Sequence, residues 1–121
     1  MYAPIFAVCF ADAAVGAALG TAPMHLYSFG EAPQGSAAAY ATWQSIGGAP
    51  ENYLGGRPDI DQFALQVDCW AATVSEVRAV AMALRDAIEP HAHITRWGGE
   101  SHDAETGLYR YSFDVLWHVS R

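Results

Sequence analysis

Two segments of the chain, residues 62–71 and 108–119, carry an apolar residue at every second position. The first series starts at Phe63 and the second at Tyr109. A period of two places all of these side chains on one face of an extended backbone. Both segments are therefore predicted to be strands that turn one face toward a core.

Two other segments have the spacing of amphipathic helices. Residues 4–15 place apolar side chains three and four positions apart, and Pro4 suits a first helical position. A second helix is expected to begin at Thr73, because Thr73 and Glu76 fit a capping box, and to end at Pro90. The apolar stripe expected on this second helix comprises Val74, Val77, Ala81, Leu84 and Ile88.

The rest of the chain is predicted to hold three further strands and three connecting loops. The strands are expected at residues 24–29, 38–46 and 91–97, and the loops at residues 30–36, 47–61 and 98–107, where glycine, proline and polar residues gather. The element order is then α-β-β-β-α-β-β. This order predicts an α+β fold in a single domain, residues 1–121, with an antiparallel sheet of four to five strands and two helices packed on one face.

Composition narrows the function classes. Of the 121 residues, 52% are hydrophobic and only 16% are charged, which excludes a disordered tail. No apolar run reaches roughly 18 residues, so no membrane span is expected. The net charge is −7 and every basic residue is arginine, which argues against tight binding of nucleic acid. The N-terminus lacks a basic region before its apolar stretch, so the chain is expected in the cytoplasm.

No pattern in the sequence indicates a metal site. His91 and His93 would share a strand face, and His102 or Cys69 could add a ligand, but the spacing matches no known metal motif. Cys9 and Cys69 each lie in an apolar segment, and both are expected to be buried, reduced thiols.

Catalytic motifs are missing as well. The acidic pairs Asp59 with Asp61 and Asp103 with Glu105 lie in expected turns, where such residues bond their own backbone. The glycines at positions 47, 48, 55 and 56 cannot form a phosphate loop, because the chain has no lysine. We therefore expect no enzyme, no cofactor and no metal.

Interaction chemistry remains. The long loop carries Tyr53, Leu54 and Arg57, and tyrosine and arginine are enriched in binding hot spots. Trp70 is expected on the polar face of its strand, where either a second helix or a neighbouring subunit would cover its ring. These four residues are the candidate interaction residues.

Several sequence runs together resemble one protein family. The runs are PENYLGGRPD at 50–59, QVDCWA at 66–71, the helix at 77–89, TGLYR at 106–110, PIF at 4–6 and GEAPQG at 30–35. Taken in chain order they cover nearly the whole sequence, and they resemble the tail-completion family of long-tailed phages and prophages.

The resemblance implies a structural virion protein, a tail terminator. Such proteins form a hexameric ring that caps the tail tube, stops its growth and offers a surface for head–tail joining. The implied partners are other copies of the chain, the tail-tube protein and the head–tail connector or stopper protein, with DNA only as passing cargo. The implied place is the head-proximal end of the tail in the virion, after synthesis in the cytoplasm of the host bacterium. No residue roles follow from the resemblance.

Two further hypotheses concern the surfaces of the subunit. An acidic subunit would repel DNA in the ring's lumen. We expect that some of seven acidic residues, all expected in or beside loops, face this lumen: Glu31, Glu51, Asp59, Asp61, Glu100, Asp103 and Glu105. The loop 51–61 is expected to reach a neighbouring subunit or the tail tube, because it is longer than a plain hairpin needs.

Two other functions remain as alternatives to a tail terminator. The first is a head–tail stopper or connector component, and the second, from a third class of function, is a small ligand-binding domain or enzyme.

Overall fold

A computed structural model describes residues 2–33, 35 and 38–121. Positions 34 and 36, in the expected loop 30–36, lie outside this part. The elements are α1 (Ile5–Phe10), α2 (Ala13–Leu19), β1 (Leu26–Ser28), β2 (Tyr40–Pro50), β3 (Ile60–Ala71), α3 (Val74–Ile88), β4 (His93–His102) and β5 (Tyr109–Ser120). The strands form one five-stranded sheet in the order β1-β2-β3-β5-β4. This arrangement confirms the α+β fold, with one difference: β1 runs parallel to β2, whereas the other pairs are antiparallel.

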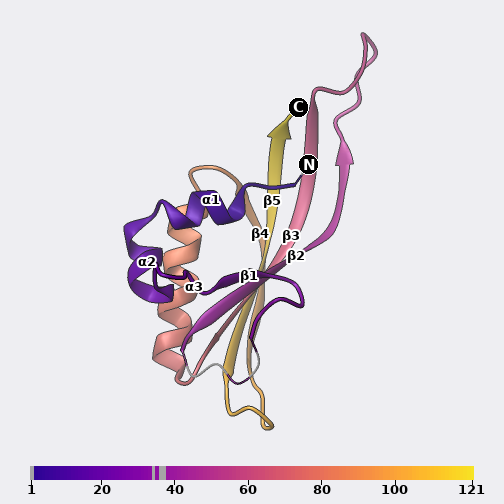
Figure 1. Cartoon of the computed structure of the whole chain (residues 1–121). Helices are drawn as coiled ribbons and strands as arrows, with labels where there is room; N and C mark the ends of the chain where they lie inside the picture. The colour runs from indigo at the N-terminus through magenta and orange to yellow at the C-terminus, as the bar shows by residue number, and fades with distance from the viewer. Residues whose placement is uncertain (1, 34, 36–37) are drawn as a thin grey trace.

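All three helices lie on the same face of the sheet (Figure 1). Two helices were expected, and the third arises because the predicted helix at 4–15 is wrong as a single element. The backbone of Asp12 is extended, which ends α1, and its carboxylate accepts a hydrogen bond of 3.0 Å from the amide of Val15. Asp12 is therefore the N-cap of α2. Gly20, with a φ of 84°, ends α2 in a backbone conformation that favours glycine.

The expected helix before Pro90 is confirmed as α3. Its N-cap is Thr73, whose hydroxyl accepts a hydrogen bond of 3.1 Å from the amide of Glu76. The helix packs against β3, β5 and both shorter helices. Its buried residues are Val77, Val80, Ala81, Leu84, Ala87 and Ile88. Val74, expected in the apolar stripe, is only half-buried.

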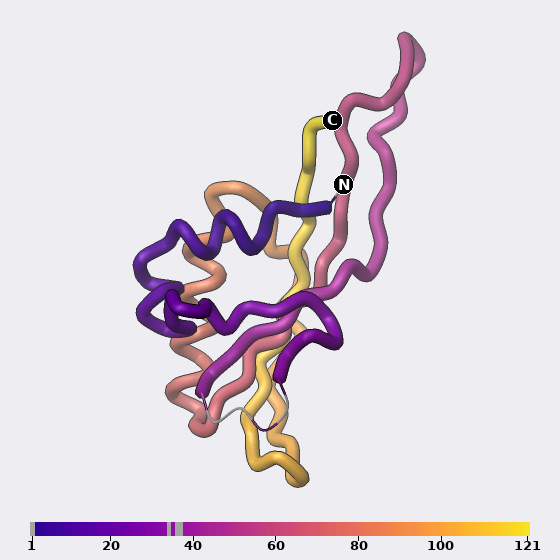
Figure 2. The backbone as a smooth tube through the Cα atoms, viewed as in Figure 1, coloured from indigo at the N-terminus to yellow at the C-terminus, as the bar shows by residue number. Residues whose placement is uncertain are grey.

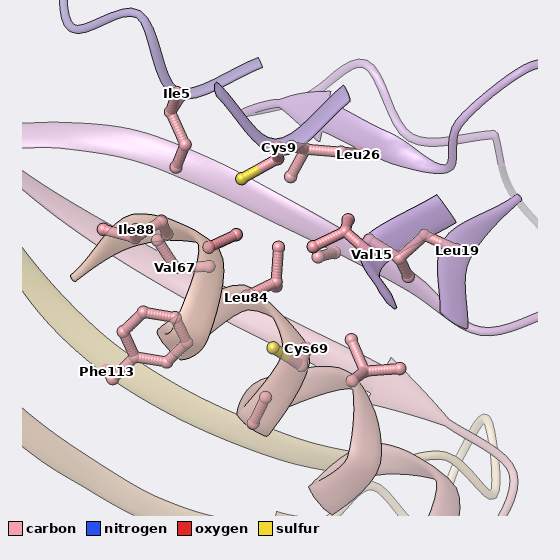
Figure 3. Packing of buried hydrophobic residues seen from close by; sticks show 14 of the residues in the cluster. Ile5, Cys9, Val15, Leu19, Leu26, Val67, Cys69, Leu84, Ile88 and Phe113 are labelled. Carbon is pink, nitrogen blue, oxygen red and sulfur yellow. The ribbon is translucent and has the colours of Figure 1, made fainter. Parts of the chain in front are cut away.

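The core lies between the helices and the central strands. Figure 3 shows Leu84 and Ile88 of α3 among residues from α1 and from the strands, including Cys9 and Phe113. Every second residue of β3 from Leu65 is buried, as the alternation predicts. Cys9 and Cys69 are both buried free thiols, as expected. Burial raises the pKa of Cys9 to about 12 and that of Cys69 further, so both stay protonated.

Three strands are longer than the sequence indicates, and β3 is one of them, because it begins at Ile60 and not at residue 62. Residues 47–50 were expected in a loop but continue β2, pairing with residues 61–64 of β3 beyond a bulge between Ser45 and Gly47. Residues 98–102 were expected in a turn but belong to β4, which pairs with β5 through two irregularities. The extensions of β2 and β4 are held by backbone hydrogen bonds to a neighbouring strand, β3 or β5. Their glycines have no side chain, so these extended segments show no alternation of apolar and polar residues in the sequence.

The sheet is longer than its helical cover. The 15 residues of α3 span about 22 Å, whereas the 12 residues of β3 or β5 span about 40 Å. The strand ends therefore extend past the helices, and Figure 2 shows the β2–β3 and β4–β5 hairpins projecting at opposite ends of the molecule.

An ion pair joins the ends of β3 and β5. Asp61 is 7% exposed, and its two carboxylate oxygens accept hydrogen bonds of 3.0 and 2.9 Å from the guanidinium of Arg121. The hydrogen bond from Arg121 holds the pKa of Asp61 below 3.8, and burial opposes this shift. The pair thus fixes the base of the β2–β3 hairpin next to the C-terminus.

Gly48 lets two backbones approach closely. A Cβ atom at Gly48 would collide with the carbonyl oxygen of Gln62, whereas one at Gly47 would meet nothing within 4 Å. Gly48→Ala should therefore lower the free energy of unfolding by about 1–3 kcal/mol, and the control Gly47→Ala should be neutral or stabilising by up to about 1 kcal/mol. Urea unfolding of both variants tests this, and equal losses in the two would contradict it.

The Asp61–Arg121 pair should make the free energy of unfolding fall as the pH is lowered into the acid range. Because the folded pKa of Asp61 is lowered, its contribution is complete above pH 3.8 and is lost as the pH falls through the lower folded value. The free energy of unfolding of Asp61→Asn, or of Arg121→Gln, should lie below that of the wild type at pH 7. This gap should close below pH 3.8. A gap of the same size at pH 7 and pH 2.5 would refute the assignment.

Candidate functional site

The most exposed apolar side chains of the β2–β3 connection lie at its end. Residues 53–57, which we call the hairpin tip, include a turn closed by a bridge between Tyr53 and Gly56. The side chain of Tyr53 lies beside Gly55 and Gly56: an added Cβ atom would be 3.6 Å from its ring at Gly55 and 3.5 Å from its hydroxyl oxygen at Gly56. Leu54 is fully exposed and Tyr53 is 54% exposed. The structure thus brings the expected residues Tyr53, Leu54 and Arg57 together on a projecting, folded-back turn (Figure 1).

Arg57 differs from the other arginines of the chain. The other five each bind a carboxylate: Arg78 with Glu100, Arg85 with Asp86 and Glu89, Arg96 with Asp114, Arg110 with Asp68, and Arg121 with Asp61. Within the described residues, Arg57 has no carboxylate partner. The hairpin tip therefore combines exposed apolar surface with an unpaired positive charge, a combination enriched in protein interfaces.

Trp70 lies on the face of the sheet opposite the helices, which we call the open sheet face. Of the two alternatives for covering its ring, a second helix of the same subunit is excluded, because the described helices all lie on the other side (Figure 1). Tyr40 stacks on the ring at 6.2 Å between centroids, and the guanidinium of Arg110 lies 5.6 Å above it. Arg110 in turn binds Asp68 at 2.7 Å. These contacts leave Trp70 half-buried within a single subunit.

Three of the seven acidic candidates are already engaged. Asp61 lies in β3 and Glu100 in β4, so the expectation that both lie in loops is corrected. Asp61 binds Arg121, and Glu100 binds Arg78 at 2.7 Å. The hydrogen bond from Arg78 lowers the pKa of Glu100. Glu51 accepts a hydrogen bond of 2.8 Å from Gln62.

The other four acidic candidates do not gather in one place. Glu31 follows β1, and Asp59 lies next to the hairpin tip. Asp103 and Glu105 lie in the β4–β5 turn, at the other end of the molecule (Figure 1), where Asp103 accepts a hydrogen bond of 2.9 Å from the amide of Glu105. The structure therefore divides the expected acidic surface between two ends.

The histidines considered as ligands do not share one strand face as expected, because β4 begins at His93 and His91 lies in the turn before it. His102 stacks on Tyr109 at 4.4 Å, and His93 lies edge-on to His118. Within residues 2–33, 35 and 38–121, no three histidine, cysteine or acidic side chains lie close enough to hold a metal ion together. None of the helices in this part of the chain has the length and hydropathy that a membrane crossing requires.

An open groove lies between α3 and the β4–β5 hairpin, and the sequence analysis did not identify it. This α3–β4 groove has a volume of about 390 Å³. It is lined by Arg78, Ala81, Met82, Arg85, Trp97, Glu100 and Tyr111. Met82 is 54% and Trp97 48% exposed. Met82 is a large apolar residue outside the apolar stripe of α3. An apolar residue on the polar side of a helix indicates an outward-facing apolar site, so the sequence did contain one indication of this groove.

Comparisons with known proteins agree with the fold. The family described as tail completion protein gp17 matches residues 3–120. A chain from the virion of a native gene transfer agent (GTA) particle is similar in structure, with a TM-score of 0.69 at 19% sequence identity, over 97% of this chain and 92% of that one. At this identity the likeness shows the shared fold. A search of curated proteins gave no match. Because the family match spans nearly the whole chain, this protein belongs to the tail completion protein gp17 family.

Proposed function

We propose that the protein is a tail terminator. Membership in the tail completion family gives it a structural role in the virion. The proposal adds that six copies close into a ring on the last ring of the tail tube. This ring stops further addition of tube protein and offers its other side to the head–tail connector. The similar fold of a chain in a gene transfer agent virion supports a phage-type particle as the setting.

The observation that carries the proposal is the state of the hairpin tip. It projects past the helical layer, exposes Leu54 completely and leaves Arg57 without a carboxylate partner among the described residues. An isolated subunit gains nothing from an exposed leucine beside an unpaired charge. A partner that buries both would gain apolar contact and an ion pair. The tip is therefore proposed to contact a neighbouring subunit or the tail tube.

Ring closure requires two different surfaces on every subunit, because a cyclic contact joins unlike patches. The hairpin tip would supply one surface. Trp70, with Tyr40 and Arg110 around it, supplies a second candidate on the open sheet face. Aromatic and arginine side chains of this kind are enriched at interfaces.

The negative charge suits a channel through which DNA passes. A net charge of −7 repels phosphates, so DNA would move through the lumen without binding. The acidic side chains outside the ion pairs with arginine are the strongest candidates to face the lumen: Glu31, Asp59, Asp103 and Glu105. Glu51, Asp61 and Glu100 contribute less, because each already binds a side chain of the same subunit. The proposal involves no catalysis and no cofactor.

Replacing Tyr53, Leu54 and Arg57 together by alanine should weaken assembly and spare the fold. The three side chains are exposed, so the free energy of unfolding should change by less than about 1 kcal/mol. Assembly on purified tail-tube ends, followed by native mass spectrometry, should weaken at least about tenfold if the tip contains a hot spot.

The matched control is Phe29→Ala, an exposed aromatic residue outside the tip, which should assemble as the wild type does. Wild-type assembly by the triple variant would show that the tip is only a connector between strands. A wild-type chain that binds connector protein but never tube ends would instead be a stopper, and the terminator proposal would fail.

A further inference from the structure

The α3–β4 groove and the hairpin tip form a complementary pair of surfaces within one sequence. Met82 and Trp97 give the groove two large apolar side chains that are about half exposed, with Tyr111 beside them. Leu54 and Tyr53 give the tip two exposed apolar side chains, the first fully exposed and the second about half. Apolar surface exposed in a groove and on a projecting turn is removed from water when the two meet.

Their charges are complementary as well. The two arginines that line the groove bind three carboxylates, because Arg78 pairs with Glu100, and Arg85 pairs with both Asp86 and Glu89. The groove and its border therefore carry one carboxylate in excess. The tip carries the one arginine that has no carboxylate partner in the described part of the chain. Docking would place Arg57 beside this excess negative charge.

The tip lies on a different side of the subunit from the groove. The groove borders β4 at one edge of the sheet, and β5 and β3 separate β4 from β2. The tip projects away from the helical layer (Figures 1 and 2). A tip that points away from the helices of its own subunit is free to meet the groove of another copy.

We propose that the hairpin tip of one copy docks in the α3–β4 groove of the next, with Leu54 against Met82 and Trp97 and with Arg57 at the acidic border. The contact joins two unlike surfaces, so each copy keeps one free tip and one free groove, and the chain of contacts continues until it closes. The inference rests on the proposed ring and names the surfaces that build it. The tail tube would then be bound through other parts of the subunit.

A mixture of two defective variants tests this directly. Leu54→Asp destroys the tip and keeps the groove, and Met82→Asp destroys the groove and keeps the tip. Both residues are at least half exposed, so both variants should fold. Each variant alone should be monomeric in sedimentation velocity up to about 1 mM protein. An equimolar mixture should contain a species of twice the chain mass and nothing larger, because only one intact contact remains.

The matched control is Phe29→Asp, which carries the same change on an exposed residue outside both surfaces and should associate like the wild type. A mixture of the two variants that stays monomeric would overturn the docking. If the wild type still forms rings on tube ends in that case, the terminator proposal stands and only the assignment of surfaces fails. If the mixture dimerises but the wild type never binds a tube end, the docking stands and the terminator proposal fails.

Discussion

The packing of α3 against the middle of the sheet is the contact on which the rest of the structure depends. Its buried side chains, Leu84 and Ile88 among them, meet buried residues at alternate positions of β3, from Leu65 to Ala71, and of β5, from Phe113 to Trp117. One layer of helices of this length covers only the centre of strands nearly twice as long. The hairpins at the two ends of the sheet are therefore not covered by helices, and no described helix covers the opposite face of the sheet. The surfaces available for assembly follow from this mismatch in length.

Charge is distributed in a way that fits the same picture. With six arginines against thirteen acidic residues, the subunit uses five arginines to neutralise carboxylates on its own surface. The more exposed of these pairs, those of Arg78 and Arg85, add little stability, but together the five leave few unpaired cations on the surface. Among the described residues Arg57 is the exception, and it lies beside the fully exposed Leu54. This cation next to exposed apolar surface supports the proposal that the tip is a surface for contact.

The sequence predicts those elements whose side chains face a core and misses those held by the backbone alone. The spacing of apolar residues and the N-cap at Thr73 were sufficient to predict α3, and the period of two was sufficient to predict most of β3 and β5. The outer parts of β2 and β4 were missed, because Gly47, Gly48, Gly98 and Gly99 carry no side chain and the strands there depend on pairing with β3 and β5. Asp12 was not predicted as an N-cap, because the helical spacing of apolar residues continues on both sides of it and indicates one uninterrupted helix. Residue type alone was enough to name candidate interaction residues at the tip, whereas the groove depends on tertiary packing that no local pattern contains.

The central claim is that the chain acts by assembly alone, as a ring that ends the growth of a tail tube. The most direct measurement is the length of tail tubes, taken by electron microscopy of particles made with and without this protein. Without it, the account predicts tubes of widely varying length that fail to join heads, and restoring the protein should bring back one length. Tubes of uniform length, joined normally to heads in its absence, would contradict the account.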